Sequence, residues 1–216
     1  PRVEVRFVEG LSANLEKKIA NGEVDFAVVL SDRYNADLVE HEFLREEVYL
    51  CVPEVLLRQY YTPEEIQGIK ERSVQGADLR DFARLPFSLM TNRLGGRIRE
   101  QFRQAGVEPW AFFTGPSTAQ TLPLCASGTA ACFSTNLSLV ERLEQMGERV
   151  NIFPLMDRGE PMVQRLSLLR HRQRYLTHFA KYFMELLFDS TAALDRIPVL
   201  RVAGGEGAVE KSVENV

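Results

Sequence analysis

VRFVEGLSANLEKKIANGEVDFAVVL, residues 5–30, decides the fold of this chain. An alternating apolar segment over residues 3–8 indicates a strand, and apolar residues at positions 11, 15 and 19 then mark one face of a helix. Asn21-Gly22 is a helix stop. Phe26–Leu30 is apolar throughout, which is typical of a strand covered on both faces. The order strand, helix, strand predicts a βαβ unit, because parallel strands need a crossover of this kind.

The composition bounds the class of protein. A length of 216 residues suffices for one large domain or two small ones. The net charge of −4 gives no general attraction to nucleic acid or to a membrane surface. No apolar run approaches the ~20 residues of a membrane span, and no signal peptide is visible. Because PRVEVRF reads directly as a strand, we expect an excised fragment or a processed chain.

The three cysteines predict core thiols. Cys51, Cys125 and Cys132 are odd in number and have apolar neighbours, which favours reduced, buried thiols in a cytoplasmic protein. Cys125 and Cys132 have no histidine or carboxylate companion at metal-ligand spacing. A redox switch is the alternative interpretation.

A second α/β cluster begins at Phe87. Strands are predicted there, with helices between them, at residues 87–90, 110–113, 129–133 and 150–155. Before this cluster, extended segments are predicted at residues 38–44 and 48–52, and Thr62-Pro63 begins a helix with Thr62 as its cap. Beyond the cluster we expect a strand at 163–169, a helix at 175–188 and a weakly ordered tail over 191–216.

The ordered series of motifs resembles the effector-binding domain of LysR-type transcriptional regulators. The matching pieces are EGLSANL at 9–15, NGEVDFAVV at 21–29, DFARLPF at 81–87, Gly96-Arg97 and LCASGTAACFSTN at 124–136. The resemblance covers residues 3–188. Two departures from the family pattern are the replacement of its usual proline by Thr135-Asn136 and a longer segment over 58–80.

The resemblance implies an α/β fold similar to type 2 periplasmic binding proteins, with two Rossmann-like lobes joined by two crossover strands. Lobe I would take residues 1–83 plus 161–190, and lobe II residues 84–160. It also implies a cytoplasmic sensor that binds a small anionic effector in the interlobe cleft, forms a homodimer or homotetramer, and needs neither a cofactor nor a membrane. DNA would be contacted only through an N-terminal winged helix-turn-helix, which these residues do not include.

With this fold, several strand ends converge on the cleft. The helix N-terminus at Ser12 and Asn14 offers free N–H groups and a dipole that favour an anion, although Ser12 also suits a purely capping role. Arg97 adds a fixed charge or is a solvated residue of its helix. Hydroxyls and amides at the other strand ends suit a small polar ligand. The candidate effector-binding residues are Ser12, Asn14, Ser31, Thr91, Asn92, Arg93, Thr118, Gln120, Ser134 and Thr135.

Two other functions remain open on this fold, a transport-type solute-binding protein and an enzyme. Signals for an enzyme are poor. No serine has a G-x-S-x-G setting, and His41, His171 and His178 are far apart in sequence. No Walker loop or dinucleotide fingerprint is present. We therefore predict that the chain is a sensor and not an enzyme.

Overall fold

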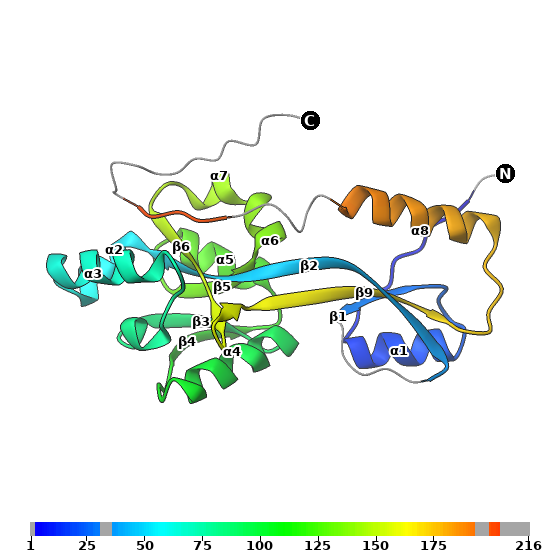
Figure 1. Cartoon of the computed structure of the whole chain (residues 1–216), viewed down its shortest axis with the longest axis horizontal. Coiled ribbons are helices and arrows are strands. Elements are labelled where there is room, and N and C mark those ends of the chain that lie inside the picture. The colour runs from blue at the N-terminus through cyan, green and yellow to red at the C-terminus, as the bar shows by residue number, and fades with distance from the viewer. Residues whose placement is uncertain (1–2, 31–35, 193–198, 204–216) are drawn as a thin grey trace. The chain divides into compact units, whose positions relative to one another are not determined.

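The computed structural model describes residues 3–30, 36–192 and 199–203 (Figure 1). The chain forms two compact units. The first takes Pro1–Glu46 and Gln164–Arg196, and the second takes Glu47–Val163 and Ile197–Val216. Two strands contribute residues to both units, β2 (Leu38–Pro53) and β9 (Val163–His171).

The first unit is built on a small antiparallel sheet. Its remaining elements are α1 (Ser12–Ala20), β1 (Ala27–Leu30) and α8 (His178–Thr191). β1 pairs antiparallel with β9, from Ala27 opposite Leu169 to Leu30 opposite Leu166, and β9 lies between β1 and β2. The core of this unit is small and consists of Ile19, Ala27, Val29, Leu38 and Leu169.

The predicted first strand does not form. Residues 3–8 take no strand conformation, and Phe7 is 87% exposed. Alternating apolar residues fit a pleated surface, but a strand also needs a hydrogen-bonded neighbour, and residues 3–8 pair with none of the described strands. Val28 is 44% exposed, so β1 is also not covered on both faces as expected. The prediction of an opening βαβ unit was therefore wrong in two respects: its first strand does not form, and its last strand, β1, is buried on one face only.

The second unit contains a mixed sheet with helices on both faces. β3 (Pro86–Met90) lies between β4 (Trp110–Gly115) and β5 (Ala131–Thr135), and both pairings are parallel. β2 continues the sheet antiparallel to β5 and pairs with β6 (Val150–Pro154). The other elements of this unit are α2 (Glu54–Tyr60), α3 (Pro63–Ser73), the 3-10 helix Leu79–Phe82, α4 (Arg93–Gln104), α5 (Thr118–Ala126), α6 (Asn136–Val140), α7 (Leu143–Met146), β7 (Met156–Asp157) and β8 (Glu160–Pro161).

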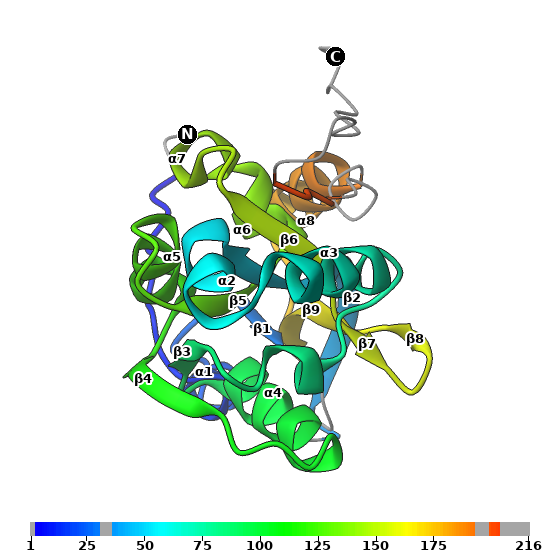
Figure 2. The ribbon, with the colours of Figure 1, turned by 90° about the vertical axis from the view of Figure 1, so that its left-hand side faces the viewer.

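Alternate residues of β5 pack on opposite faces of this sheet, which Figure 2 shows between α4 and α5. Phe133 packs with Phe87 and with Phe102 of α4, at ring-centroid distances of 5.8 and 5.9 Å. Cys132 instead packs with Leu122 and Cys125 of α5. Burial of each such phenylalanine contributes roughly 1.5–3 kcal/mol. Phe133 is therefore a core residue.

The boundary between units differs from the predicted lobes. The two extended segments expected at 38–44 and 48–52 form one continuous strand, β2, whose later half belongs to the second unit. Leu57 of α2 and Ile66 of α3 share a buried cluster with Phe87. Residues 47–83 therefore lie in the second unit and not in lobe I.

The predicted start of α3 is present. Thr62 is the N-cap, its hydroxyl accepts from the Glu65 N–H at 3.3 Å, and the Glu65 carboxylate accepts from the Thr62 N–H at 2.9 Å. Pro63 is the first helical residue. This reciprocal pair is a capping box, which satisfies two donors that the helix cannot.

The predicted weakly ordered tail is partly corrected. Within it, residues 199–203 pack on the second unit, where Ile152 and Arg201 exchange two backbone hydrogen bonds of 2.8 and 3.1 Å. The Ala203 N–H donates to Asn151 Oδ1 at 2.8 Å. The rest of the tail beyond residue 192 lies outside the described residues. None of the helices described combines the length and apolar character needed to cross a membrane.

Candidate functional site

Seven predicted site residues lie at one edge of the second unit's sheet. Because β3 is parallel to both β4 and β5, the carboxyl ends of all three strands reach the same edge. Met90, the last residue of β3, is level with Gly115, the last residue of β4. We call these residues the strand-edge group: Thr91, Asn92, Arg93, Thr118, Gln120, Ser134 and Thr135.

Asn92 and its neighbours fix the start of α4. Asn92 Oδ1 accepts from the Gly95 N–H at 3.0 Å, so this amide is used as the helix cap. The Thr91 N–H donates to the Gly115 carbonyl at 2.9 Å, which ties the edge to β4. A Cβ on Gly95 would lie 1.8 Å from the Met90 carbonyl oxygen, so only glycine permits this close approach of helix to strand.

Two arginines follow on α4. Arg93 is exposed in a first turn that contains no acidic residue. Arg97 is not simply solvated, because its guanidinium donates to the Val163 carbonyl at 2.5 Å and lies 3.9 Å from Asp157. Arg97 therefore has a structural contact. Arg93 is a cationic residue in the first turn of α4, at a helix N-terminus where anions are favoured.

The start of α5 is open to a ligand. Ser117 is the N-cap position, but no side chain caps the helix, and its first turn contains no acidic residue. Thr118 is half-buried and Gln120 is exposed. A Cβ on Gly115 would lie 2.3 Å from Gln120 Oε1, so the Gln120 amide lies against the last residue of β4.

Ser134 and Thr135 are buried at the end of β5, although the sequence predicted them to follow the strand. Ser134 has no exposed surface, and its hydroxyl has no hydrogen-bond partner among the described residues. Sequence reasoning missed three further hydroxyls in the same condition, those of Ser73, Ser88 and Thr121. The signal for Ser88 was a polar residue inside the apolar strand PFSLM.

The first unit holds two of the predicted residues. Ser12 is the first residue of α1 and is half-buried, while Asn14 is exposed. The N-cap is Leu11 and no side chain caps α1, so the capping role considered for Ser12 was wrong. The first turn of α1 has no acidic residue, which leaves a helix N-terminus that favours anions. Ser31 lies outside the described residues.

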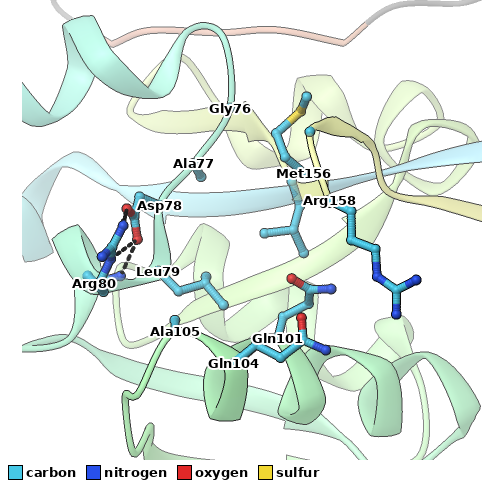
Figure 3. Close-up of a pocket in the computed structure, with 12 residues that line it drawn as sticks. Gly76, Ala77, Asp78, Leu79, Arg80, Gln101, Gln104, Ala105, Met156 and Arg158 are labelled. Atoms are coloured by element: carbon cyan, nitrogen blue, oxygen red, sulfur yellow. Dashed lines mark hydrogen bonds and ion pairs between the residues drawn. The ribbon is translucent and has the colours of Figure 1, made fainter.

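The second unit also has two adjoining hollows beside α4, of about 450 and 480 Å³. Figure 3 shows the first, between α4, the loop at residues 76–80 and the hairpin of β7 and β8. Both are lined by Gln101, Gln104 and Arg158, and we call them together the α4 groove. Sequence reasoning missed it because its three segments are far apart in the chain.

The three cysteines are buried free thiols, as predicted. Cys51 and Cys132 lie opposite each other on β2 and β5, and Cys125 Sγ donates to the Cys51 carbonyl at 3.6 Å. Hydrogen bonding with Cys132 raises the pKa of Cys51, and burial raises the pKa of Cys125. Both thiols are therefore neutral at ordinary pH. Across the described residues, no group of three or more histidine, cysteine or acidic side chains is arranged to hold a metal.

Comparison with solved structures shows the fold. HinK from Pseudomonas aeruginosa, a LysR family transcriptional regulator, aligns with a TM-score of 0.64 at 16% identity over 87% of this chain and 60% of its own. The effector binding domain of QuiR in complex with shikimate aligns with a TM-score of 0.60 at 14% identity, covering 85% and 79%. These likenesses confirm the predicted α/β fold class, the two-lobed periplasmic-binding-protein-like fold.

Comparison of sequences shows the family. The sequence profile of the LysR substrate binding domain matches residues 1–192. The "Uncharacterized HTH-type transcriptional regulator YcgK" of Bacillus subtilis (strain 168) is 27% identical over 225 residues. That match takes all of this chain and 64% of the relative's length. The chain belongs to the LysR substrate binding domain family, the effector-binding domains of LysR-type transcriptional regulators.

Proposed function

We propose that this domain senses a small anionic effector, and that the strand-edge group holds it. One observation carries the proposal: two helices, α4 and α5, begin at the same sheet edge, and neither has an acidic residue in its first turn. Helix N-termini attract anions through their free N–H groups and dipoles. Arg93 strengthens that preference, since it adds a full positive charge in the first turn of α4.

The uncapped first turn of α5 supplies the directed hydrogen bonds. Thr118 contributes a hydroxyl and a backbone N–H, and Gln120 contributes an amide at the exposed side of the edge. A carboxylate accepts from all of these donors. The buried Ser134 hydroxyl is a further donor that a rearrangement on binding would recruit, because it has no partner among the described residues.

The effector would act by changing a population of conformations. A ligand shifts such an equilibrium only by its differential affinity for the two states. We propose that this shift reaches DNA in the full-length protein, through a helix-turn-helix segment in the part of the YcgK-like relative that this chain does not span. A cytoplasmic homodimer or homotetramer is the assembly proposed for that protein.

Calorimetric titration of Thr118→Ala tests the site. A panel of small acids, starting with shikimate because the QuiR domain was solved with it, first identifies a ligand. Loss of one hydrogen bond to a charged group then predicts a fall in affinity of about tenfold. Thr129→Ala is the matched control, because Thr129 lies at the opposite, amino end of β5.

The results separate the alternatives. Unchanged affinity in Thr118→Ala would place the effector elsewhere, and an equal loss in Thr129→Ala would indicate a general effect on the fold. Chemical turnover of the bound acid, lost in Thr118→Ala, would favour the enzyme over the sensor.

A further inference from the structure

Arg158 occupies a backbone position that arginine rarely takes. It follows β7 in the tight hairpin where Met156 pairs with Pro161 and Asp157 with Glu160. Its φ is 54° and that of Gly159 is 85°, so both turn residues have positive φ. Asparagine, aspartate and glycine are the residues usually found there. In the described part of the chain no other non-glycine residue has positive φ, so Arg158 occupies a strained backbone position.

The charge of Arg158 has no partner in the part of the chain that the structure describes. No hydrogen bond or ion pair joins its guanidinium to any residue that the structure describes. Two acids near it are already engaged. Asp157 faces Arg97 at 3.9 Å, and Glu100 is bound by Arg103 at 2.5 Å. The hairpin also carries Glu160, but no ion pair joins Glu160 to Arg158 among the described residues, so the Arg158 guanidinium is free to bind an anion in the α4 groove.

The groove has the form of a binding site. Arg158 lines both of its hollows, and Figure 3 shows its side chain extending from the hairpin toward α4, on the side where Gln101 and Gln104 lie. The Gln101 amide makes no hydrogen bond within the described residues, so its N–H₂ is available as a second donor. Hollows of about 450 Å³ fall within the range of small-molecule sites.

The opposite wall of the groove is fixed in place. Gly76 has a φ of 154°, and a Cβ there would lie 2.3 Å from Met156 Cγ. The loop at residues 76–80 is thus packed closely on β7. At its far end Asp78 holds Arg80 in a hydrogen-bonded ion pair, so this wall adds no free negative charge.

We propose that the α4 groove is a second ligand site, which binds a small molecule through a carboxylate or phosphate group. Arg158 pairs with the oxyanion, because a guanidinium matches both groups with two parallel hydrogen bonds, and Gln101 donates a third. Gln101 lies eight residues along α4 from Arg93, about 12 Å at 1.5 Å per residue. Arg93 of the strand-edge group also lines the second hollow, whereas the first hollow is lined by Gln101 and Arg158 but not by Arg93. The site at Gln101 and Arg158 therefore extends beyond the strand-edge group and goes beyond the effector function proposed above.

Titration by ¹⁵N NMR tests this site, with citrate and inorganic phosphate as probes and the ionic strength held constant with chloride. We expect saturable shifts at the Gln101 and Gly159 amides. Arg158→Gly and Arg158→Asn suit positive φ and keep the hairpin folded, and each should lower the probe's affinity at least tenfold with an unchanged melting temperature. Arg58→Ala removes an exposed arginine of α2 outside the groove and is the matched control.

The two probes also distinguish the ligand classes. Tighter binding of citrate assigns the site to carboxylates, and tighter binding of phosphate assigns it to phosphate groups. The proposal is overturned if neither probe gives saturable shifts, if Arg58→Ala loses as much affinity as Arg158→Gly, or if the shifts are confined to the strand-edge group.

Discussion

Two adjacent glycines of α4 carry opposite energetic roles. Gly95 meets the Met90 carbonyl, whereas a Cβ on Gly96 would meet nothing within 4 Å. Gly95 therefore allows the helix to begin directly against β3, and Gly96 is only a flexible residue within a helix. The sequence does not distinguish the two glycines, and only the backbone geometry separates their roles.

We predict that Gly95→Ala destabilises the domain by about 3 kcal/mol, because backbone atoms would have to move. Gly96→Ala is the control and should stabilise it by about 0.5–1 kcal/mol, as alanine does in an exposed helix. Urea unfolding of both variants measures the difference. Equal free energies of unfolding would show that α4 does not approach Met90 as described.

At the scale of single elements, α3 is held by its capping box. The Thr62 N–H donates to the Glu65 carboxylate, and this hydrogen bond lowers the pKa of Glu65 below its ordinary value of 4.5. A group whose folded-state pKa is lowered stabilises the fold fully above its unfolded pKa and loses that contribution as the pH falls through the lowered value. The capping box should therefore weaken in acid.

Thr62→Ala is predicted to cost about 1 kcal/mol at pH 7, the usual value of an N-cap. Thr62→Ala keeps the backbone N–H that donates to the Glu65 carboxylate, so Glu65→Gln is the variant that tests the pH-dependent half of the box. The difference between wild type and Glu65→Gln should shrink as the pH is lowered from 5 toward 3. Unfolding by urea, followed across that pH range, measures it. A difference that is independent of pH would mean that the Glu65 half of the box does not contribute.

Some elements could be predicted from sequence and others could not. β3 and the start of α3 carry local signals, an apolar run and a Thr-Pro pair, and both were predicted nearly to the residue. The break expected in β2 at residues 45–47 was wrong because charged residues alternate with buried ones there, and Glu46 itself is buried and accepts from Gln164 at 3.3 Å. The strand predicted at residues 3–8 was wrong, because an alternation of apolar and polar residues does not specify which strand will pair with it.

The candidate site likewise has parts that could be predicted from the sequence and parts that could not. The strand-edge group could be predicted, since strand ends and polar residues are both visible in sequence. The burial of Ser134 could not, because it depends on α5 packing over β5. The α4 groove needed three segments distant in the chain, so no local pattern indicated it.

At the scale of the whole molecule, the two units differ in the size of their cores. The cluster in the first unit contains five buried residues. The second unit buries far more, including Phe82, Phe87, Phe102, Phe133 and Phe153. Because local stability follows buried apolar contact, the first unit should open more readily.

Hydrogen exchange measured by mass spectrometry tests this expectation. Peptides from β1 and α1 should exchange about tenfold faster or more than peptides from β3 and β5. Thermal unfolding of the same sample shows whether global stability explains the rates. Equal protection in both sets would indicate one cooperative unit.

The short segment at residues 199–203 has a practical meaning for making this domain. The family match ends at residue 192. Beyond it, Arg201 pairs with Ile152 at the edge of β6 that β2 leaves free, and the Lys70 ammonium donates to the Ala203 carbonyl at 2.5 Å. Protein cut at the family boundary would leave the N–H and C=O of Ile152 unpaired and would uncover Asn151. Unpaired sheet edges recruit other chains. Poor solubility of such a truncated domain would thus result from the loss of residues 199–203 and not from a defect in effector binding.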